Sequence, residues 1–273
     1  MRIIRHCLLV LPGLAACSGS PAEATRTSGA GASPAALPTT KAAAATPAPA
    51  AANSVPWQHL ALRQLPAALR PTGQLLEAGR WLDLNGENIL VASRSVITDD
   101  DQAGEGRAAR LLVRQYVRPL GGTGFYRQLW QLQDAVTDCP LDLTLGLLPG
   151  STCVSDLDGN GRTETTLVYA LACRGGVDPA ALKLILREGA AKYALRGIAL
   201  EMQGGPDEVA RARQQAAGPT CCAGPDSDST YWRNYGLYDT EKEFATAPPA
   251  FLAFARQQWR RWRTRADAGT EVQ

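Results

Sequence analysis

Hydrophobic and polar residues alternate along the middle of the chain, which is the pattern of β-strands. Leu141, Leu143, Leu145 and Leu147 are separated by polar or small residues, and this period of two predicts a half-buried strand. We predict further strands where apolar, β-branched and aromatic residues gather: a hairpin over 81–91 around an Asn-Gly pair, strands at 111–118 and 124–132, and a second hairpin formed by 182–187 and 192–196.

Two other segments show helical spacing. Residues 206 to about 217 begin with Pro-Asp-Glu and are followed by Gly218-Pro219, which are typical start and stop signals. Residues 249 to about 263 carry an apolar stripe of Phe251, Phe254, Ala255, Trp259 and Trp262. Arginines crowd the other side. We favour a helix that packs its aromatic side chains on the sheet; the alternative is a contact with lipopolysaccharide phosphates or other polyanions. Together these elements predict a β-rich α+β fold, with a mostly antiparallel sheet and a C-terminal helix.

The N-terminus has the layout of a secretory signal peptide over residues 1–16, with a basic start, an apolar run and small residues at the end. The ending Leu14-Ala15-Ala16-Cys17 resembles the lipobox of bacterial lipoproteins. This resemblance implies cleavage before Cys17 and acylation of that residue, which would hold the chain at a lipid bilayer. Ser18 follows instead of an aspartate, which by the same resemblance favours the outer membrane. The alternative is an ordinary cleaved signal in which the cysteine occurs by chance.

The remaining chain divides by composition. Residues 17–56 are almost entirely Ala, Pro, Ser, Thr and Gly, and they predict a disordered tether because they cannot bury enough apolar surface to order. Residues 57–265 are long enough for a real core, and we predict a single β-rich globular domain there. Residues 266–273 are predicted to form a disordered tail.

Charge and histidine content exclude several classes of function. Removal of the signal removes Arg2 and Arg5, so the 28 basic residues become 26, against 26 acidic ones. With a net charge near zero, nucleic acid is not an expected partner. His59 is the one histidine left after the signal, which excludes a His-rich zinc site. A Ser-His-Asp or Cys-His mechanism would have to use His59, at the edge of the tether.

Besides Cys17, the mature chain holds five cysteines, and disulfides are expected in an oxidising envelope: Cys139, Cys153, Cys173, Cys221 and Cys222. An odd number leaves at least one thiol free or paired elsewhere. The adjacent Cys221-Cys222 lacks the two-residue spacer of a C-x-x-C redox motif, so a structural role is favoured.

The sharpest chemical motif is an acidic loop. Asp156, Asp158 and Asn160 stand at loop positions 1, 3 and 5, Gly161 stands at position 6, and Glu164 at position 9. Calcium takes six to eight oxygen ligands at 2.3–2.6 Å, and this spacing turns alternate residues inward. The pattern therefore predicts a calcium site.

The loop departs from a complete EF-hand, because position 12 is Leu167 and not a bidentate glutamate. The flanking residues suit strands, so the loop resembles the strand-loop-strand calcium turns of integrin-like repeats. In that arrangement Arg162 would offer its backbone carbonyl while its side chain points to solvent. The alternative is a turn that binds no metal, since turns also favour Asp, Asn and Gly. We expect a bound ion to be structural rather than catalytic.

The segment 138–197 is similar to bacterial envelope proteins described as surface polysaccharide biosynthesis proteins. The motifs that carry the resemblance are Asp138-Cys139-Pro140-Leu141-Asp142, the acidic loop, Ala172-Cys173-Arg174-Gly175 and Lys192 to Gly197. The resemblance implies a disulfide between Cys139 and Cys173. A simple meander through 141–173 would place these cysteines at opposite ends of the sheet, so either the strand order is different or the bond is wrong.

Two functions fit these observations. The first is a non-enzymatic outer-membrane lipoprotein whose calcium loop rigidifies a module that binds an envelope component such as polysaccharide or lipopolysaccharide. The second is a polysaccharide-acting enzyme that uses two carboxylates about 5–5.5 Å or 6.5–9.5 Å apart. Its candidate residues are Asp138, Asp142, Asp178 and Glu188.

Overall fold

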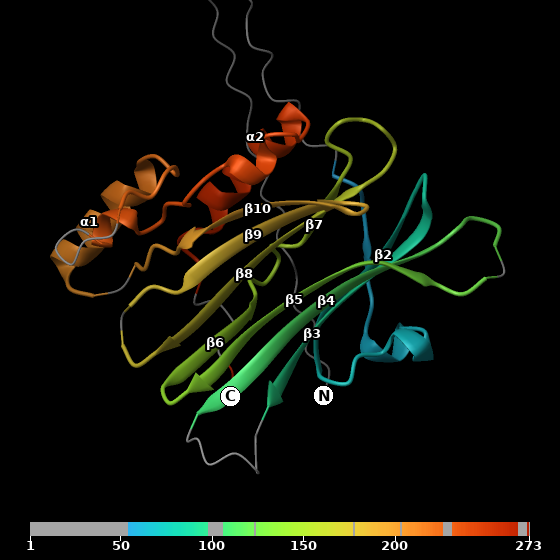
Figure 1. The fold of residues 1–273 in the computed structure, drawn as a ribbon, viewed down its shortest axis with the longest axis horizontal. Coiled ribbons are helices and arrows are strands. Elements are labelled where there is room, and N and C mark those ends of the chain that lie inside the picture. The colour runs from blue at the N-terminus through green and yellow to red at the C-terminus, as the bar shows by residue number, and fades with distance from the viewer. Residues whose placement is uncertain are drawn as a thin grey trace, which may run out of the picture. The chain divides into compact units, whose positions relative to one another are not determined.

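A computed structural model describes residues 54–97, 106–122, 124–176, 178–202, 204–225, 231–266 and 272. In these ranges the chain forms two antiparallel sheets (Figure 1). The first is a meander of β1 (Gln58–His59), β2 (Gln74–Asp83), β3 (Gly86–Ile97), β4 (Arg107–Arg118) and β5 (Arg127–Cys139). The second contains β6 (Asp142–Leu147), β7 (Cys153–Ser155), β8 (Glu164–Arg174), β9 (Ala181–Glu188) and β10 (Ala191–Ile198). The predicted β-rich α+β class is therefore confirmed.

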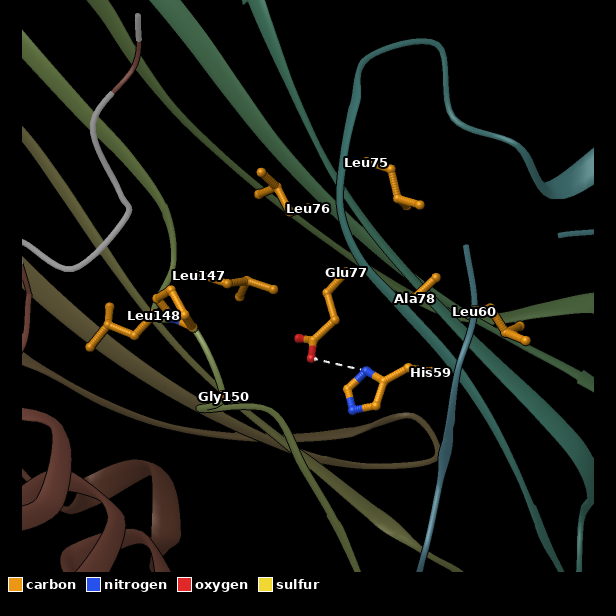
Figure 2. A pocket seen from close by; sticks show the side chains of 10 residues that line it. His59, Leu60, Leu75, Leu76, Glu77, Ala78, Leu147, Leu148 and Gly150 are labelled. Carbon is orange, nitrogen blue, oxygen red and sulfur yellow. Dashed lines mark ion pairs between the residues drawn. The ribbon is translucent and has the colours of Figure 1, made fainter. Parts of the chain in front are cut away.

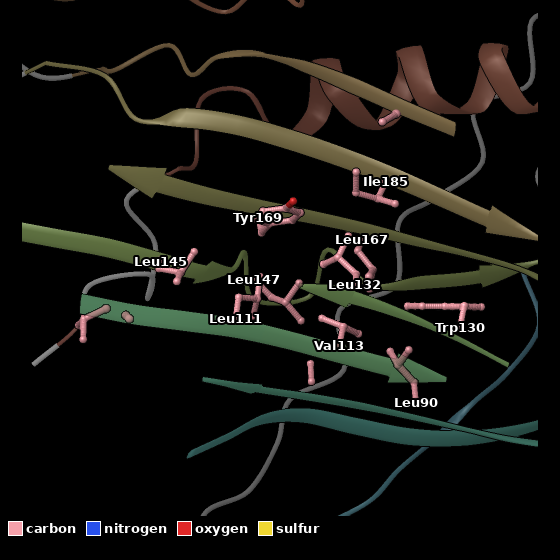
Figure 3. Packing of buried hydrophobic residues seen from close by; sticks show 14 of the residues in the cluster. Leu90, Leu111, Val113, Trp130, Leu132, Leu145, Leu147, Leu167, Tyr169 and Ile185 are labelled. Carbon is pink, nitrogen blue, oxygen red and sulfur yellow. The ribbon is translucent and has the colours of Figure 1, made fainter. Parts of the chain in front are cut away.

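The main core lies between the two sheets (Figure 3). Leu111 and Val113 on β4 belong to the same buried cluster as Leu167 and Tyr169 on β8. The alternate residues of β8 point to the opposite face of their sheet. That face is covered as well, so β8 is buried on both sides over most of its length.

Helix α2 (Pro249–Trp262) covers this second face, as the aromatic stripe predicted. Phe251, Phe254 and Trp259 pack against apolar residues of β8, β9 and β10, including Val168 and Leu184. Helix α1 (Pro206–Ala217) has the predicted bounds. The chain also forms four short 3-10 helices within the described residues: η1 (Leu62–Gln64), η2 (Ala67–Leu69), η3 (Tyr231–Asn234) and η4 (Lys242–Phe244). Among the described residues, no helix has both the length and the apolar character needed to cross a membrane.

Two strand predictions need correction. Strand β6 is not half-buried, because Thr144 and Gly146 are as enclosed as the leucines between them in a sheet that is covered on both faces. The first hairpin turns one residue earlier than the Asn-Gly pair suggests, since Asp83 pairs with Gly86 and the loop is Leu84-Asn85. Gly86 instead begins β3 with a φ of 122°, where it passes close to the backbone of Arg118.

The ends of the domain extend past the predicted limits. Ser54 forms a bridge with Ser155, and the Val55 N–H donates to the Val154 carbonyl at 2.9 Å, so these residues of the predicted tether belong to the fold. Within the predicted tail, Ala266 and Val272 are buried. The signal peptide, Cys17 and the rest of the tether lie outside the described residues.

Cys139 and Cys173 are joined in a disulfide, with Cα atoms 5.5 Å apart. The strand order is not a simple meander, because β6 skips β7 and pairs directly with β8. Leu143 consequently lies opposite Cys173, and Cys139 is only a few residues before it. Cys221 and Cys222 form a second disulfide, and Cys153 is a free cysteine.

Candidate metal centre

The predicted acidic loop connects β7 to β8 as a strand-loop-strand turn. Ser155 pairs with Glu164 at its base, so the residues between them form a closed excursion at one end of the second sheet. Gly159 and Gly161 have φ values of 73° and 78°, which residues with a Cβ rarely adopt. Gly161 also has the side chain of Leu84 against it, with the Leu84 Cγ 2.8 Å from where a Cβ would stand.

Three carboxylates converge inside this turn. Asp156, Asp158 and Glu164 each place one oxygen within 4.8 Å of the others, so the triad could hold a metal ion. Asp158 is exposed, Asp156 is half-buried, and Glu164 is 0 % exposed. A cation held here would have solvent on one side and the sandwich on the other.

Backbone N–H groups of the loop hold each carboxylate by one oxygen. Asp156 Oδ2 accepts from the Gly161 N–H at 3.0 Å, and Glu164 Oε2 accepts from the Leu157 N–H at 2.8 Å. Asp158 Oδ1 accepts from the Asn160 N–H at 3.2 Å. The second oxygens of two of these groups, Asp156 Oδ1 and Glu164 Oε1, are buried and have no hydrogen-bond donor. An ordinary turn explains the first set of contacts but not the second, because a buried carboxylate oxygen without a partner is costly.

The raised pKa of Glu164 also favours a cation at this position. Burial raises the pKa of Glu164 to about 7, and the charges of Asp158 and Glu188 add to this rise against the hydrogen bonds from Leu157 and Ser155. A carboxyl in this position is stabilised either by a proton or by a cation.

The two remaining predicted ligands are less directly placed. The Asn160 Nδ2 group faces the carboxylates, donating to Asp158 Oδ2 at 3.1 Å and to Glu188 Oε1 at 2.5 Å. The Asn160 Oδ1 accepts from the Arg162 N–H at 2.7 Å. The Arg162 residue is exposed. Asn160 would therefore have to turn its amide to present oxygen to a cation in the cluster.

Glu188 is a member of the site that the loop motif could not reveal. It lies at the end of β9, opposite Glu164 in the antiparallel register of β8 and β9. The predicted second hairpin placed Glu188 at the start of its turn, and this was the available signal. Pairing of β9 with β8 is needed to bring Glu188 to the loop.

A hairpin of the first sheet supports the loop from outside. The Asp83 Oδ2 accepts from both the N–H and the hydroxyl of Thr163, at 3.1 and 2.8 Å. The buried Trp81 Nε1 donates to the same hydroxyl at 2.8 Å. The Leu84 N–H donates to the Gly161 carbonyl at 2.9 Å. These contacts join the two sheets at the acidic loop.

Glu188 lies far from the other carboxylates considered for an enzyme. Asp142 pairs in register with Arg174, at one end of β8, and forms an ion pair with Arg107. Glu188 lies opposite Glu164, at the other end of β8. These ends are separated by the 11 residues of β8, roughly 33 Å. Asp138 and Asp178 lie at the same end as Asp142, but the Asp142 side chain is 89 % exposed, unlike the partly buried carboxylates of a catalytic cleft.

His59 lies in a cavity of about 410 Å³ at the edge of the two sheets (Figure 2). Its Nδ1 is 3.9 Å from Glu77 Oε1, and the Thr152 hydroxyl donates to the other oxygen of Glu77. Burial raises the pKa of Glu77, opposed by the Thr152 hydrogen bond and by His59. Thr152 thus donates to Glu77 rather than to His59, which is not the arrangement of a hydroxyl activated by histidine.

A second cavity of about 300 Å³ lies beside α1, at the opposite end of the second sheet from the acidic loop. Tyr231, Trp232 and Tyr235 line it together with Asp178 and Arg211. The rings of Tyr231 and Tyr235 meet edge to face with centroids 5.7 Å apart. Aromatic and polar groups that converge in this way are typical of a small-molecule site.

The fold and the loop together define an antiparallel β-sandwich with an acidic triad able to hold a metal ion. No protein-family model, curated protein or solved structure matches this chain. The similarity to surface polysaccharide biosynthesis proteins therefore stays a prediction from the motifs quoted above.

Proposed function

We propose that this protein is an outer-membrane lipoprotein, acylated at Cys17, whose loop binds calcium as a structural ion. The ion rigidifies a non-enzymatic module that binds an envelope component, and we favour polysaccharide over lipopolysaccharide. The distance of Glu188 from the other candidate catalytic carboxylates, and the 89 % exposure of the Asp142 side chain, support a binding role over the carboxylate-based enzyme.

The main observation in support of the metal site is the environment of Glu164. This side chain is fully buried, one oxygen is held by the Leu157 N–H, and the other has no donor. It belongs to the same triad as Asp156 and Asp158. A cation in the triad would supply the missing partner and offset the like charges.

Calcium fits the donor set better than other common ions. All candidate ligands are oxygens, which favours hard cations over zinc or copper. Calcium tolerates irregular geometry and mixed carboxylate and carbonyl ligands, whereas magnesium demands a near-ideal octahedron. Extracellular modules bind calcium at about 10⁻⁴–10⁻³ M, which suits a structural role outside the cytoplasm.

The polysaccharide part of the proposal is supported by the cavity beside α1, which we call the aromatic cavity, and by the similarity to surface polysaccharide biosynthesis proteins. Aromatic faces such as those of Trp232 and Tyr231 can stack on the apolar side of a sugar ring. Asp178 and Arg211 can accept from or donate to its hydroxyl groups.

Thermal unfolding of the full chain tests the calcium site. We expect calcium at about tenfold above its Kd to raise Tm by about 4 °C, and EDTA to reverse the effect. Asp158→Asn should abolish the shift, while Asp142→Asn, an exposed acidic residue outside the triad, should retain it. A calcium-dependent shift of equal size in Asp158→Asn would contradict the proposal.

A further inference from the structure

The most exposed large apolar side chains of the described domain gather at one end. Leu82, Leu84, Leu120 and Phe125 are 61, 74, 66 and 98 % exposed, and the other exposed large apolar residues are all below 50 %. Single exposed apolar residues are ordinary, but a group of protruding ones at one end of a fold marks an interaction surface.

Two neighbouring loops carry these four residues. Leu82 and Leu84 belong to the β2–β3 hairpin, and Leu120 and Phe125 to the β4–β5 loop. The loops lie against each other, because a Cβ on Gly86 would be 2.9 Å from the Pro119 Cα. We call this group of four residues the apolar tip.

The acidic loop lies at the same end as the apolar tip. Leu84 touches it directly, through the hydrogen bond from its N–H to the Gly161 carbonyl and through the side-chain contact at Gly161. Figure 1 shows the β2–β3 hairpin, the β4–β5 loop and the β7–β8 loop at one end of the sheets. A cation in the triad would therefore lie close to the protruding Leu84 side chain, at the end of the sheets that also carries Phe125.

The chain also enters the domain here. Ser54 bridges Ser155, the residue before Asp156. The segment that precedes Ser54 contains Cys17, the predicted site of acylation. A lipid anchor attached through this segment would reach the domain at the end that carries the apolar tip and the acidic loop.

We infer that this end docks on the surface of an anionic lipid bilayer, with the apolar tip among the acyl chains and the bound calcium bridging to lipid phosphates. The inference rests on the proposed calcium site and lipid anchor. Leucine and phenylalanine gain free energy on leaving water for the acyl-chain boundary. A cation that keeps one side open to solvent can accept phosphate oxygens as additional ligands. The bound cation would thereby attract the negatively charged lipid headgroups, which the acidic loop without a cation would repel. Docking would orient the domain so that the aromatic cavity, at the other end of the second sheet, faces away from the membrane.

Vesicle co-sedimentation of the full chain carrying Cys17→Ser, which removes the acylation site, tests this inference. We expect binding to vesicles of phosphatidylglycerol and phosphatidylethanolamine at about 1 mM calcium. Binding should be lost in EDTA and on phosphatidylcholine vesicles. Phe125→Ser should weaken it by at least about tenfold. Val96→Ser is the matched control, since Val96 is 45 % exposed at the far end of β3 and should leave binding unchanged.

Titration calorimetry of the same protein with calcium separates the two proposals. Calcium binding without any calcium-dependent vesicle binding would overturn the docking surface and leave the metal site standing. Vesicle binding that Phe125→Ser and Val96→Ser reduce equally would also overturn it. Absence of calcium binding would remove the metal site, and tip-dependent sedimentation that persists in EDTA would then show that calcium does not form the bridge.

Discussion

Glu164 of β8 lies directly opposite Glu188 of β9 in the antiparallel register, although the two side chains carry the same charge. Like charges opposite each other across a strand pair are destabilising. Glu164 is also buried, and the charge of Glu188 contributes to its raised pKa. A cation in the acidic triad would offset this repulsion, because its positive charge would lie beside both carboxylates.

Glu188→Gln tests that relationship. The substitution removes one negative charge but retains an oxygen that can accept the hydrogen bond from Asn160. We expect the metal-free protein to become more stable by about 0.5 kcal/mol, because the cross-strand repulsion is lost. Calcium affinity should fall by about three- to tenfold. Urea unfolding in EDTA and calcium titration calorimetry measure the two effects, and a fall in metal-free stability would contradict the explanation.

The raised pKa of Glu164 predicts how stability depends on pH. Folding raises this pKa from 4.5 to about 7, so between these values the folded protein holds a proton that the unfolded chain has released. The free energy of unfolding of the metal-free protein should therefore be highest below pH 4.5 as far as this group is concerned. It should fall by up to about 3 kcal/mol as pH rises to about 7.

Calcium should change this dependence, because at the proposed site calcium and the proton would compete for Glu164. Apparent calcium affinity should fall by up to about tenfold per pH unit below about 7. Urea unfolding of the wild type and of Glu164→Gln in EDTA, over this pH range, isolates the contribution. Glu164→Gln keeps an acceptor for the Leu157 N–H and should lack both the pH-dependent loss and the stabilisation by calcium. A pH profile that is the same for both proteins would contradict the assignment.

The features that the sequence predicts well are local ones. The spacing of Asp156, Asp158 and Glu164 is contained within nine residues, so the turn could be predicted without knowing the rest of the fold. Helix α1 likewise begins at Pro206 and ends before Gly218, because proline and glycine act on the backbone at their own positions.

The features that it could not predict depend on long-range pairing. Glu188 reaches the acidic loop because β8 pairs with β9. Asp83 contacts the same loop because the first sheet packs on the second. The burial of Thr144 has the same origin, since alternation within β6 cannot show that both faces of its sheet are covered. Register and layer order are properties of distant segments, and a strand pattern alone does not specify its partner.

The disulfide between Cys139 and Cys173 should contribute substantially to stability. It closes a loop over a sequence separation of 34 residues, and links β5 of the first sheet to β8 of the second. Replacing both cysteines by alanine should lower the free energy of unfolding by about 2–4 kcal/mol, because the unfolded chain gains freedom. Urea midpoints under oxidising conditions measure this, with Cys153→Ser, at the free cysteine, as the control. Equal midpoints for the double variant and the wild type would show that the bond contributes nothing.

Trp232→Ala examines the polysaccharide part of the proposal. The Trp232 side chain is exposed at the aromatic cavity. The hydrogen bond from Gln215 goes to the backbone carbonyl of Trp232, which the substitution retains, so we expect the variant to fold. Loss of one stacking ring should weaken binding of purified envelope polysaccharide by about tenfold, as aromatic contacts are worth about 0.5–1.5 kcal/mol beyond the area they bury. Calorimetric titration with the polysaccharide gives the affinity. Phe125→Ala, which removes an exposed ring at the other end of the molecule, should leave that affinity unchanged. If both variants bind like the wild type, the cavity is not the polysaccharide site; if both lose affinity, the polysaccharide contacts the apolar tip as well.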